Sequence, residues 1–281
     1  MNLPGRRLSA FPFIRIGLHE LSPMQLAAAR FATATVLVLG WLAWRRPRRP
    51  TARDAMAFAL SGLLGIAGYN ALLNIAELSV APGAAAFIMS TSPIVTALLS
   101  TLFLREKLNR WGWAGSLFSF AGIGLIASGQ HGGLALGSGT TLILLAAAGS
   151  AVYFVLQRRL IPVYGPLACT AYTLLAGAVP LLPWLPGALR SLAAPGALHA
   201  ALPAVLVLGI FPAALGYASW TFALSHFGPA RATHFLYLVP AAAMGLSIFM
   251  TGERPGLATL GGGSMAIAGV AAVALRGRSS R

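Results

Sequence analysis

The sequence predicts an all-α membrane protein with ten transmembrane helices in two inverted five-helix repeats. Three observations support this fold class. Hydrophobic residues make up 57% of the 281 residues and charged residues only 9%, and the mean hydropathy is +0.78, so a water-soluble fold could not bury the apolar surface. Apolar segments of membrane-spanning length recur along the chain. The second half of the chain also repeats the first.

Nine apolar segments in the sequence approach the length of about 20 residues that a transmembrane helix needs. Each must be a helix, because backbone groups exposed to lipid have to satisfy their hydrogen bonds within the segment. The nine segments lie near residues 24–44, 54–76, 83–104, 111–129, 139–157, 166–185, 201–224, 229–251 and 257–275.

A tenth segment, residues 8–18, predicts an incomplete first helix. A weak repeat at an offset of 143 residues matches Arg15 with Arg158 and would place Arg6 and Arg7 in mid-membrane, where each charge costs several kcal/mol. Since a full span needs about 20 residues, we expect roughly ten or more residues of this helix to be missing from the sequence. A cleaved signal peptide fits less well, because a proline and an arginine interrupt the apolar region.

An ungapped repeat at an offset of 147 residues joins the two halves and divides the chain into residues 1–137 and 138–281. Five helices in each half make the second half enter the membrane from the opposite side, and inverted repeats of this kind place a substrate site near the bilayer midplane. The matched pairs are Pro82 with Pro229, Pro93 with Pro240, Glu106 with Glu253, Gly115 with Gly262 and Gly122 with Gly269.

The basic residues predict that both termini are cytoplasmic. With the N-terminus inside, 16 of the 20 Lys and Arg residues fall in cytoplasmic segments, as the positive-inside rule requires. Arg190 and Arg254 fall in outer loops, and Arg15 and Arg30 lie at membrane depth, towards the outer ends of their helices. The basic residues form short runs without interleaved aromatic residues, which favours a membrane surface over a nucleic acid as partner.

Two matched prolines mark the predicted substrate site. Pro93 and Pro240 lie near the middle of their predicted helices and remove the hydrogen bonds that the carbonyls of Met89 and Leu236 would accept. These carbonyls could bind a substrate ammonium, or neighbouring helices and water could satisfy them. With Pro93 and Pro240 as hinges, the predicted substrate-binding residues are Tyr69, Asn70, Asn74, Phe87, Met89, Ser90, Tyr153, Tyr217, Trp220, His234 and Tyr237.

The residue types of this set predict a mixed polar and aromatic cavity. Each residue taken alone could instead serve helix packing or an interhelical hydrogen bond. Asn70 and Asn74 share a helix face at a spacing of four residues, and the pairs Phe87 with His234 and Asn70 with Tyr217 occupy matching repeat positions.

The small number of acidic, histidine and cysteine residues argues against an enzyme. Glu77 lies near a helix end and Glu106 and Glu253 lie at turns, so no carboxylate is predicted in mid-membrane for a catalytic triad or an ion relay. The five histidines are scattered and Cys169 is the only cysteine, which leaves no metal cluster. No glycine-rich phosphate loop is present, and no cofactor is predicted.

Three segments of the sequence carry a family resemblance. FLREKLNRWGWAGSLFSFAGIGLIA and MTGERPGLATLGGGSMAIAGVAAVA resemble the hallmark of the drug/metabolite transporter superfamily in its EamA-domain branch, and FPFIRIGLHELSPMQLAAARFATATVLVL resembles the opening of the same family. The resemblance covers nearly the whole chain and is nearest to YddG-type bacterial exporters of aromatic and other neutral amino acids. It implies ten helices in two inverted repeats, alternating access and a central cavity. The Trp-Gly pair that the family carries before the position of Phe11 is absent here.

The sequence therefore predicts a bacterial inner-membrane exporter of small neutral or zwitterionic metabolites, chiefly amino acids with large apolar side chains. Its partners are a small-molecule substrate and the lipid bilayer. One alternative is an antiporter for phosphorylated sugars or nucleotide sugars, which would make Arg30 essential. Another is a non-transporting membrane enzyme or lipid-handling scaffold.

Overall fold

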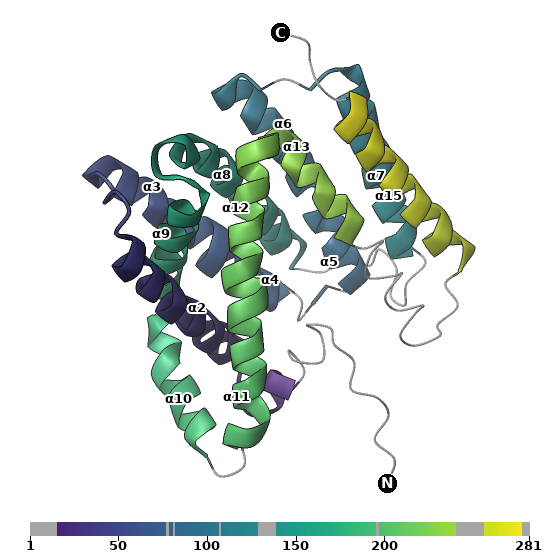
Figure 1. Cartoon of the computed structure of the whole chain (residues 1–281). Helices are drawn as coiled ribbons and strands as arrows, with labels where there is room; N and C mark the ends of the chain where they lie inside the picture. Colours follow the sequence, from purple (N-terminus) through teal and green to yellow (C-terminus); the bar gives the residue numbers. More distant parts are fainter. Residues whose placement is uncertain are drawn as a thin grey trace. The chain divides into compact units, whose positions relative to one another are not determined.

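The computed structural model describes residues 16–76, 79–80, 82–106, 108–128, 139–194, 197–239 and 256–276, and the regular structure in these ranges is helical, with no β-strand (Figure 1). Eight helical segments within the described residues have the length and apolar composition to cross a membrane. The prediction of an all-α, multi-pass membrane protein is confirmed. Most of the predicted first helix and residues 240–251 of the span 229–251, with Pro240, lie outside the described residues, so the number of ten helices stays a prediction.

The chain folds as two compact units, each of which combines residues from both halves of the sequence. Unit 1 comprises residues 1–67 and 160–222, and unit 2 comprises residues 68–159 and 223–281. The boundaries after residues 67, 159 and 222 all fall inside helical segments, so several helices contribute residues to both units.

Unit 1 is built around its longest helix, α2 (Pro23–Arg45), which contacts most of the other elements of the unit. Its core contains the buried side chains of Phe31, Ile66, Leu174 and Leu181. The other elements are α3 (Ala52–Gly62), the π-helical segment η1 (Leu63–Gly68), α9 (Pro166–Ala178), the 3-10 segment η3 (Val179–Trp184), α10 (Leu185–Ala193), α11 (Ala197–Leu208), the π-helical segment η4 (Gly209–Leu215) and the start of α12 (Gly216–Phe227).

Local sequence signals fix both ends of α2. Ser22 and Gln25 form a reciprocal capping box, in which each side chain accepts a hydrogen bond from the backbone N–H of the other residue, at 2.9 and 3.3 Å, and Pro23 takes the first helical position. At the other end Arg46 adopts a left-handed conformation, with φ of 43°, and its N–H donates to the carbonyl of Leu42.

Unit 2 centres on the antiparallel pair of α7 (Arg110–Ser128) and α15 (Leu257–Arg276), which lie side by side in Figure 1. At one end of the pair, Asn109 Nδ2 donates to the carbonyl of Arg276 at 2.6 Å. The other elements are α4 (Tyr69–Ala76), α5 (Pro82–Met89), α6 (Ser92–Leu99), the π-helical segment η2 (Ser100–Leu104), most of α8 (Thr140–Tyr164), the end of α12, α13 (Pro229–Ala232) and the 3-10 segment η5 (Thr233–Tyr237).

Small residues bring α7 and α15 into close contact. A β-carbon on Gly115 would lie 2.6 Å from the carbonyl oxygen of Gly269, and one on Gly122 would lie 2.6 Å from that of Gly262. Ser119, between the two glycines of α7, donates a hydrogen bond to the carbonyl of Ala266 at 3.1 Å. Close approach through glycine is the usual means of packing helices in a membrane, where burial from water gives no driving force. We call these contacts the glycine seam.

Several of the predicted spans are not single α-helices in the described residues. The span 54–76 is divided into α3, η1 and α4, and the span 201–224 into α11, η4 and α12. The two π-helical segments occupy matching repeat positions, because an offset of 147 residues carries residues 63–68 of η1 onto residues 210–215 of η4. Pro212 lies inside η4 and cannot donate a backbone hydrogen bond, which disfavours a regular α-helix there.

The span 83–104 also differs from the prediction. Pro93 was expected in the middle of one helix, but α5 ends at Met89 and α6 begins at Ser92, so that Pro93 lies at the start of the second helix. Proline is favoured in the first turn of a helix because its missing N–H has no partner to lose there. At the break, the hydroxyl groups of Ser90 and Thr91 each donate to a backbone carbonyl at 2.7 Å.

Candidate functional site

The structure distributes the predicted substrate-binding residues over both units. Tyr217 and Trp220 lie on α12 in unit 1, and the others lie on α4, α5, α8 and η5 or in the turn after α5, all in unit 2. The side chain of Asn74 and the second predicted hinge, Pro240, lie outside what the structure describes.

In unit 1, Tyr217 joins α12 to the irregular turn of η1. Its hydroxyl donates a hydrogen bond to the carbonyl of Gly65 at 3.0 Å. Its ring meets the ring of Phe31 edge to face, with the centroids 6.1 Å apart, and the Arg30 guanidinium lies 4.8 Å from the Phe31 centroid. We call Arg30, Phe31, Gly65 and Tyr217 the Tyr217 cluster. It combines a cation, aromatic rings and a carbonyl of a π-helical turn.

The position of Arg30 is unusual for a charged residue in a membrane span. Arg30 is half-buried and lies seven residues into α2, about 10 Å from the start of the helix at a rise of about 1.5 Å per residue. From the sequence alone, Arg30 has a predicted role only in the alternative of a phosphorylated, anionic substrate. Ionisable residues inside spans usually mark a substrate pathway, so this general rule could have found it. Helical segments with π geometry, such as η1, are likewise frequent at functional sites.

In unit 2, His234 and Tyr237 of η5 meet α7. The ring nitrogen Nε2 of His234 shares a short hydrogen bond with the hydroxyl of Ser116, and both His234 and Tyr237 are 1% exposed. Phe87 of α5 stacks on Phe120 of α7 with centroids 4.7 Å apart, and both rings pack on the apolar cluster that contains Tyr237. We call these five residues the His234 cluster.

Sequence reasoning missed the two members of the His234 cluster that belong to α7. Ser116 and Phe120 are four residues apart and therefore share a helix face. Among the residues of α7, the sequence repeat singles out only Gly115 and Gly122. Serine residues within an otherwise apolar span were the available signal, since their hydroxyl groups often bond across helices.

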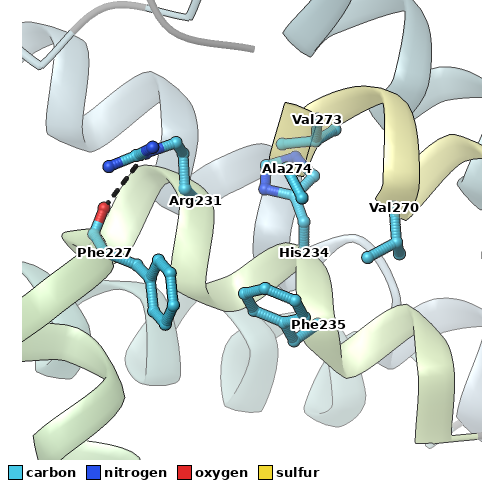
Figure 2. Close-up of a pocket in the computed structure, with 7 residues that line it drawn as sticks. All are labelled: Phe227, Arg231, His234, Phe235, Val270, Val273 and Ala274. Atoms are coloured by element: carbon cyan, nitrogen blue, oxygen red, sulfur yellow. Dashed lines mark hydrogen bonds between the residues drawn. The ribbon is translucent and has the colours of Figure 1, made fainter. Parts of the chain in front are cut away.

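A small pocket lies beside the His234 cluster, with a volume of about 40 Å³. Figure 2 shows His234 between the aromatic rings of Phe227 and Phe235 on one side and α15 on the other, while the Arg231 side chain turns towards the carbonyl of Phe227, to which Nε donates at 3.2 Å. A pocket of this size admits a few water molecules but no aromatic side chain. Its lining residues are Phe227, Arg231, His234, Phe235, Val270, Val273 and Ala274.

The remaining predicted residues lie outside the Tyr217 and His234 clusters. Met89 packs on a buried apolar cluster around Ile88, and the hydroxyl of Ser90 donates to the carbonyl of Ala86. Tyr153 is buried beside Phe154, with centroids 5.1 Å apart. Tyr69 and Asn70 on α4 and Trp220 on α12 are half-buried.

The turn at Glu106 forms an ionic brace inside unit 2. Glu106 Oε1 accepts a hydrogen bond from Arg158 Nε of α8 at 2.8 Å, and Arg158 Nη1 donates to the carbonyl of Ser225 at 3.3 Å. Gly228, with φ of +71°, precedes α13, and a β-carbon there would lie 2.7 Å from Glu106 Oε2. The carboxylate therefore lies near the N-terminus of α13, where a negative charge is favourable. Glu106 is a structural turn residue, as the sequence indicated.

Within the described residues, no group of three or more His, Cys, Asp or Glu side chains could hold a metal ion. The arrangement is a multi-pass helical membrane protein with interrupted spans, a half-buried cation beside a π-helical turn, and a buried histidine between packed helices. These are features of a membrane transporter.

The chain belongs to the EamA-like transporter family. The family model matches twice, over residues 9–128 and 137–275. Members of this family are transporters, so the chain is a transporter and not an enzyme.

Similar proteins cover nearly the whole chain. The uncharacterized transporter YdfC of Bacillus subtilis is 37% identical over 262 residues, which are 93% of this chain and 85% of that protein. A probable terminal-alkyne amino-acid exporter of Streptantibioticus cattleyicolor is 36% identical over 266 residues, 93% of this chain and 87% of that protein. The uncharacterized inner membrane transporter YedA of Escherichia coli is 30% identical over 247 residues, 87% of this chain and 79% of that protein.

A solved crystal structure has the same fold. It superposes with a TM-score of 0.76 and covers 95% of this chain and 93% of its own chain, at 20% sequence identity.

Proposed function

We propose that this transporter exports zwitterionic metabolites, chiefly aromatic and other large apolar amino acids, from the cytoplasm across the bacterial inner membrane. The observation that carries the proposal is the Tyr217 cluster. It places a guanidinium group, aromatic rings and the carbonyl of a π-helical turn within one compact unit. No single substrate charge would need both the cation and the carbonyl, whereas a zwitterion would use both.

The chemistry of an amino acid fits this arrangement. Arg30 offers the hydrogen-bond fork that matches a carboxylate, and carbonyl groups of η1 can accept hydrogen bonds from an ammonium group. Tyr217 and Trp220 are three residues apart on α12 and share a helix face, so both can contact an apolar side chain. Since the hydroxyl of Tyr217 already donates to Gly65, an arriving ammonium would compete for this carbonyl.

The relatives and the helix packing support the mechanism as well as the substrate. The exporter of Streptantibioticus cattleyicolor is named for an amino-acid substrate.

In the glycine seam, Gly115 contacts Gly269 and Gly122 contacts Gly262, although the repeat matches Gly115 with Gly262 and Gly122 with Gly269. Such reciprocal contacts between antiparallel helices are expected from inverted repeats. We therefore include ten helices, cytoplasmic termini and alternating access, with hinges at Pro93 and Pro240, in the proposal.

Transport by purified protein in liposomes tests the substrate class. Vesicles preloaded with phenylalanine or methionine are expected to accumulate the labelled amino acid by counterflow. Arg30→Gln removes the proposed carboxylate partner and should lower this flux at least tenfold. Arg190→Gln, which removes an exposed charge in the same unit, should leave the flux unchanged. Flux no greater than in empty liposomes would reject the substrate class, and full activity of Arg30→Gln would reject its role.

The half-buried Arg30 also favours a second candidate, an antiporter for phosphorylated sugars or nucleotide sugars, because guanidinium groups bind phosphate well. This candidate predicts counterflow of a labelled sugar phosphate that phenylalanine does not inhibit. The amino-acid proposal predicts the reverse pattern of inhibition, so one competition series separates them.

A further inference from the structure

The loop between α2 and α3, together with the helix residues that flank it, carries an unusual concentration of positive charge. Residues 45–53, which we call the arginine loop, contain five arginines, and all five are exposed. The loop follows a membrane-spanning helix directly. Trp44, 77% exposed, precedes it and lies under the Arg45 guanidinium at 5.5 Å. A tryptophan at this position is typical of the interface between lipid and water. The five arginines are Arg45, Arg46, Arg48, Arg49 and Arg53.

Aromatic residues of unit 1 hold the backbone of the arginine loop in place. The hydroxyl of Tyr172 donates to the carbonyl of Arg48 at 3.1 Å, and the N–H of Thr51 donates to the hydroxyl of Tyr164 at 3.3 Å. The rings of Tyr164 and Tyr172 both pack on the buried ring of Phe58, at 5.5 and 5.3 Å between centroids. A run of like charges would otherwise repel itself and remain unfolded.

The one acidic residue beside the loop is used for structure. Asp54 Oδ2 accepts hydrogen bonds from the hydroxyl of Tyr164 at 2.6 Å and from that of Thr51 at 2.8 Å, and Thr51 caps α3. None of the five guanidinium groups forms an ion pair with a carboxylate among the described residues. All five side chains are exposed, so an anion outside the protein can reach their hydrogen-bond donors.

We propose that the arginine loop is a binding site for the headgroups of anionic phospholipids. Arginine binds phosphate oxygens through paired N–H groups, and basic segments next to a membrane span are attracted to an anionic leaflet. The aromatic scaffold holds the backbone of the loop in place, so that lipid binding orders little further backbone and loses less conformational entropy. The inference does not depend on which substrate is transported.

Hydrogen–deuterium exchange of the full chain in nanodiscs localises the proposed site. Exchange of residues 45–54 is expected to be slower in phosphatidylglycerol than in phosphatidylcholine with the same acyl chains. Equal exchange in the two lipids would overturn the proposal. Millimolar glycerol phosphate added to phosphatidylcholine nanodiscs should not reproduce the protection, and full protection by glycerol phosphate would show a site for soluble anions instead.

Variants then test which charges act. Each arginine near an anionic surface strengthens association about fivefold. The double variant Arg48→Gln with Arg49→Gln should therefore weaken phosphatidylglycerol binding by at least tenfold. Native mass spectrometry of the detergent-solubilised protein measures this binding. The matched control, Arg105→Gln with Arg110→Gln, removes two exposed arginines from the two ends of the connection between η2 and α7 and should have a much smaller effect. Equal losses from the two double variants would show diffuse attraction and overturn the proposal.

The aromatic scaffold gives an independent readout. Tyr164→Phe keeps every arginine but removes the hydrogen bonds with Thr51 and Asp54. It should weaken phosphatidylglycerol binding about threefold if the ordered loop is the site, which corresponds to one modest hydrogen bond. Unchanged binding would contradict the ordered site. If a short RNA displaced phosphatidylglycerol from the loop at equal concentration, the lipid assignment would be wrong.

Discussion

The glycine seam of unit 2 and the Tyr217 cluster of unit 1 use opposite kinds of packing. In the seam, two regular α-helices approach so closely that the backbone of one meets the glycines of the other. In the cluster, a π-helical turn offers the carbonyl of Gly65 to a side chain, beside an arginine that lies within a membrane span.

The contrast shows where this transporter can tolerate polar groups. The regular helices of the seam satisfy their own backbone hydrogen bonds, and their small side chains leave no room for a substrate. At the Tyr217 cluster, the backbone of η1 has π-helical instead of α-helical hydrogen bonds. The cluster also contains the half-buried charge of Arg30, which would be unfavourable in a membrane span without a function. The proposed division is that the seam supports the fold and the cluster binds substrate, and substitutions in each region can test it.

The largest expected effect is a loss of stability in the seam. Gly122→Ala places a β-carbon 2.6 Å from the carbonyl oxygen of Gly262 and should force the helices apart. Overpacking of this kind costs about 1–3 kcal/mol. Thermal unfolding in detergent should show a lower midpoint. Gly40→Ala is the control, because nothing lies within 4 Å of a β-carbon there, and it should be neutral or slightly stabilising. Equal effects of the two substitutions would remove the special role of the seam.

The next-largest effect is expected from Pro212→Ala, which should raise stability and lower transport. Pro212→Ala restores a backbone donor inside η4, so the segment can return to α geometry, with a gain of about 1–2 kcal/mol out of the roughly 3 kcal/mol that proline costs in a helix. If π geometry serves transport, flux should fall while the unfolding midpoint rises. The control is Pro203→Ala, within the α-helix α11, which should raise the unfolding midpoint without lowering flux. Unchanged flux in Pro212→Ala would separate η4 from function.

A smaller effect is expected from the hydroxyl of Tyr217. Tyr217→Phe removes the hydrogen bond to Gly65, worth about 1 kcal/mol, and should change amino-acid flux about fivefold. Tyr172→Phe removes a similar hydrogen bond from the same unit, to the carbonyl of Arg48, and should leave flux in neutral phosphatidylcholine vesicles as it is. The comparison would fail if the two variants transported equally well.

The smallest effect concerns the ionic brace. Glu106→Gln removes the charge that pairs with Arg158, and because both side chains are partly exposed the loss should be about 1 kcal/mol or less. Salt should weaken the wild-type brace in the same direction, so the difference between wild type and variant should shrink at high ionic strength. Glu20→Gln, at an exposed position, should show no difference at any ionic strength. A salt-independent loss would mean that packing around the carboxylate, not its charge, stabilises the turn.

Much of the fold could be predicted from sequence because its signals are local. Apolar length gave the membrane spans, and Ser22, Thr51 and the Gly-Pro pairs before α9 and α13 mark helix starts. The repeat also found residues that matter, since Gly115 and Gly122 form the seam with their matched glycines. It could not give the crossed pairing, in which Gly115 meets Gly269, because sequence equivalence does not specify contact.

The candidate site was less predictable. Residue type and depth predict Tyr217, His234 and Tyr237 as site residues, along with Phe87, and these assignments stay predictions. The structure adds contacts that residue type and depth do not contain. Ser116 and Phe120 join them only because α7 faces η5 and α5. The break before Pro93 was expected as a kink within one helix, but hydroxyl groups at residues 90 and 91 favour two separate helices.

By itself, the sequence determined that this protein is an apolar, helical, internally repeated membrane transporter, because composition and segment length decide whether a chain can leave water. Only the tertiary structure decided the π-helical turns at η1 and η4, the position of Arg30 over Phe31, and the scaffold under the arginine loop. These features depend on which distant side chains meet a given backbone segment, and a hydrogen-bond register or a charge inside a span is stable only when those neighbours are in place.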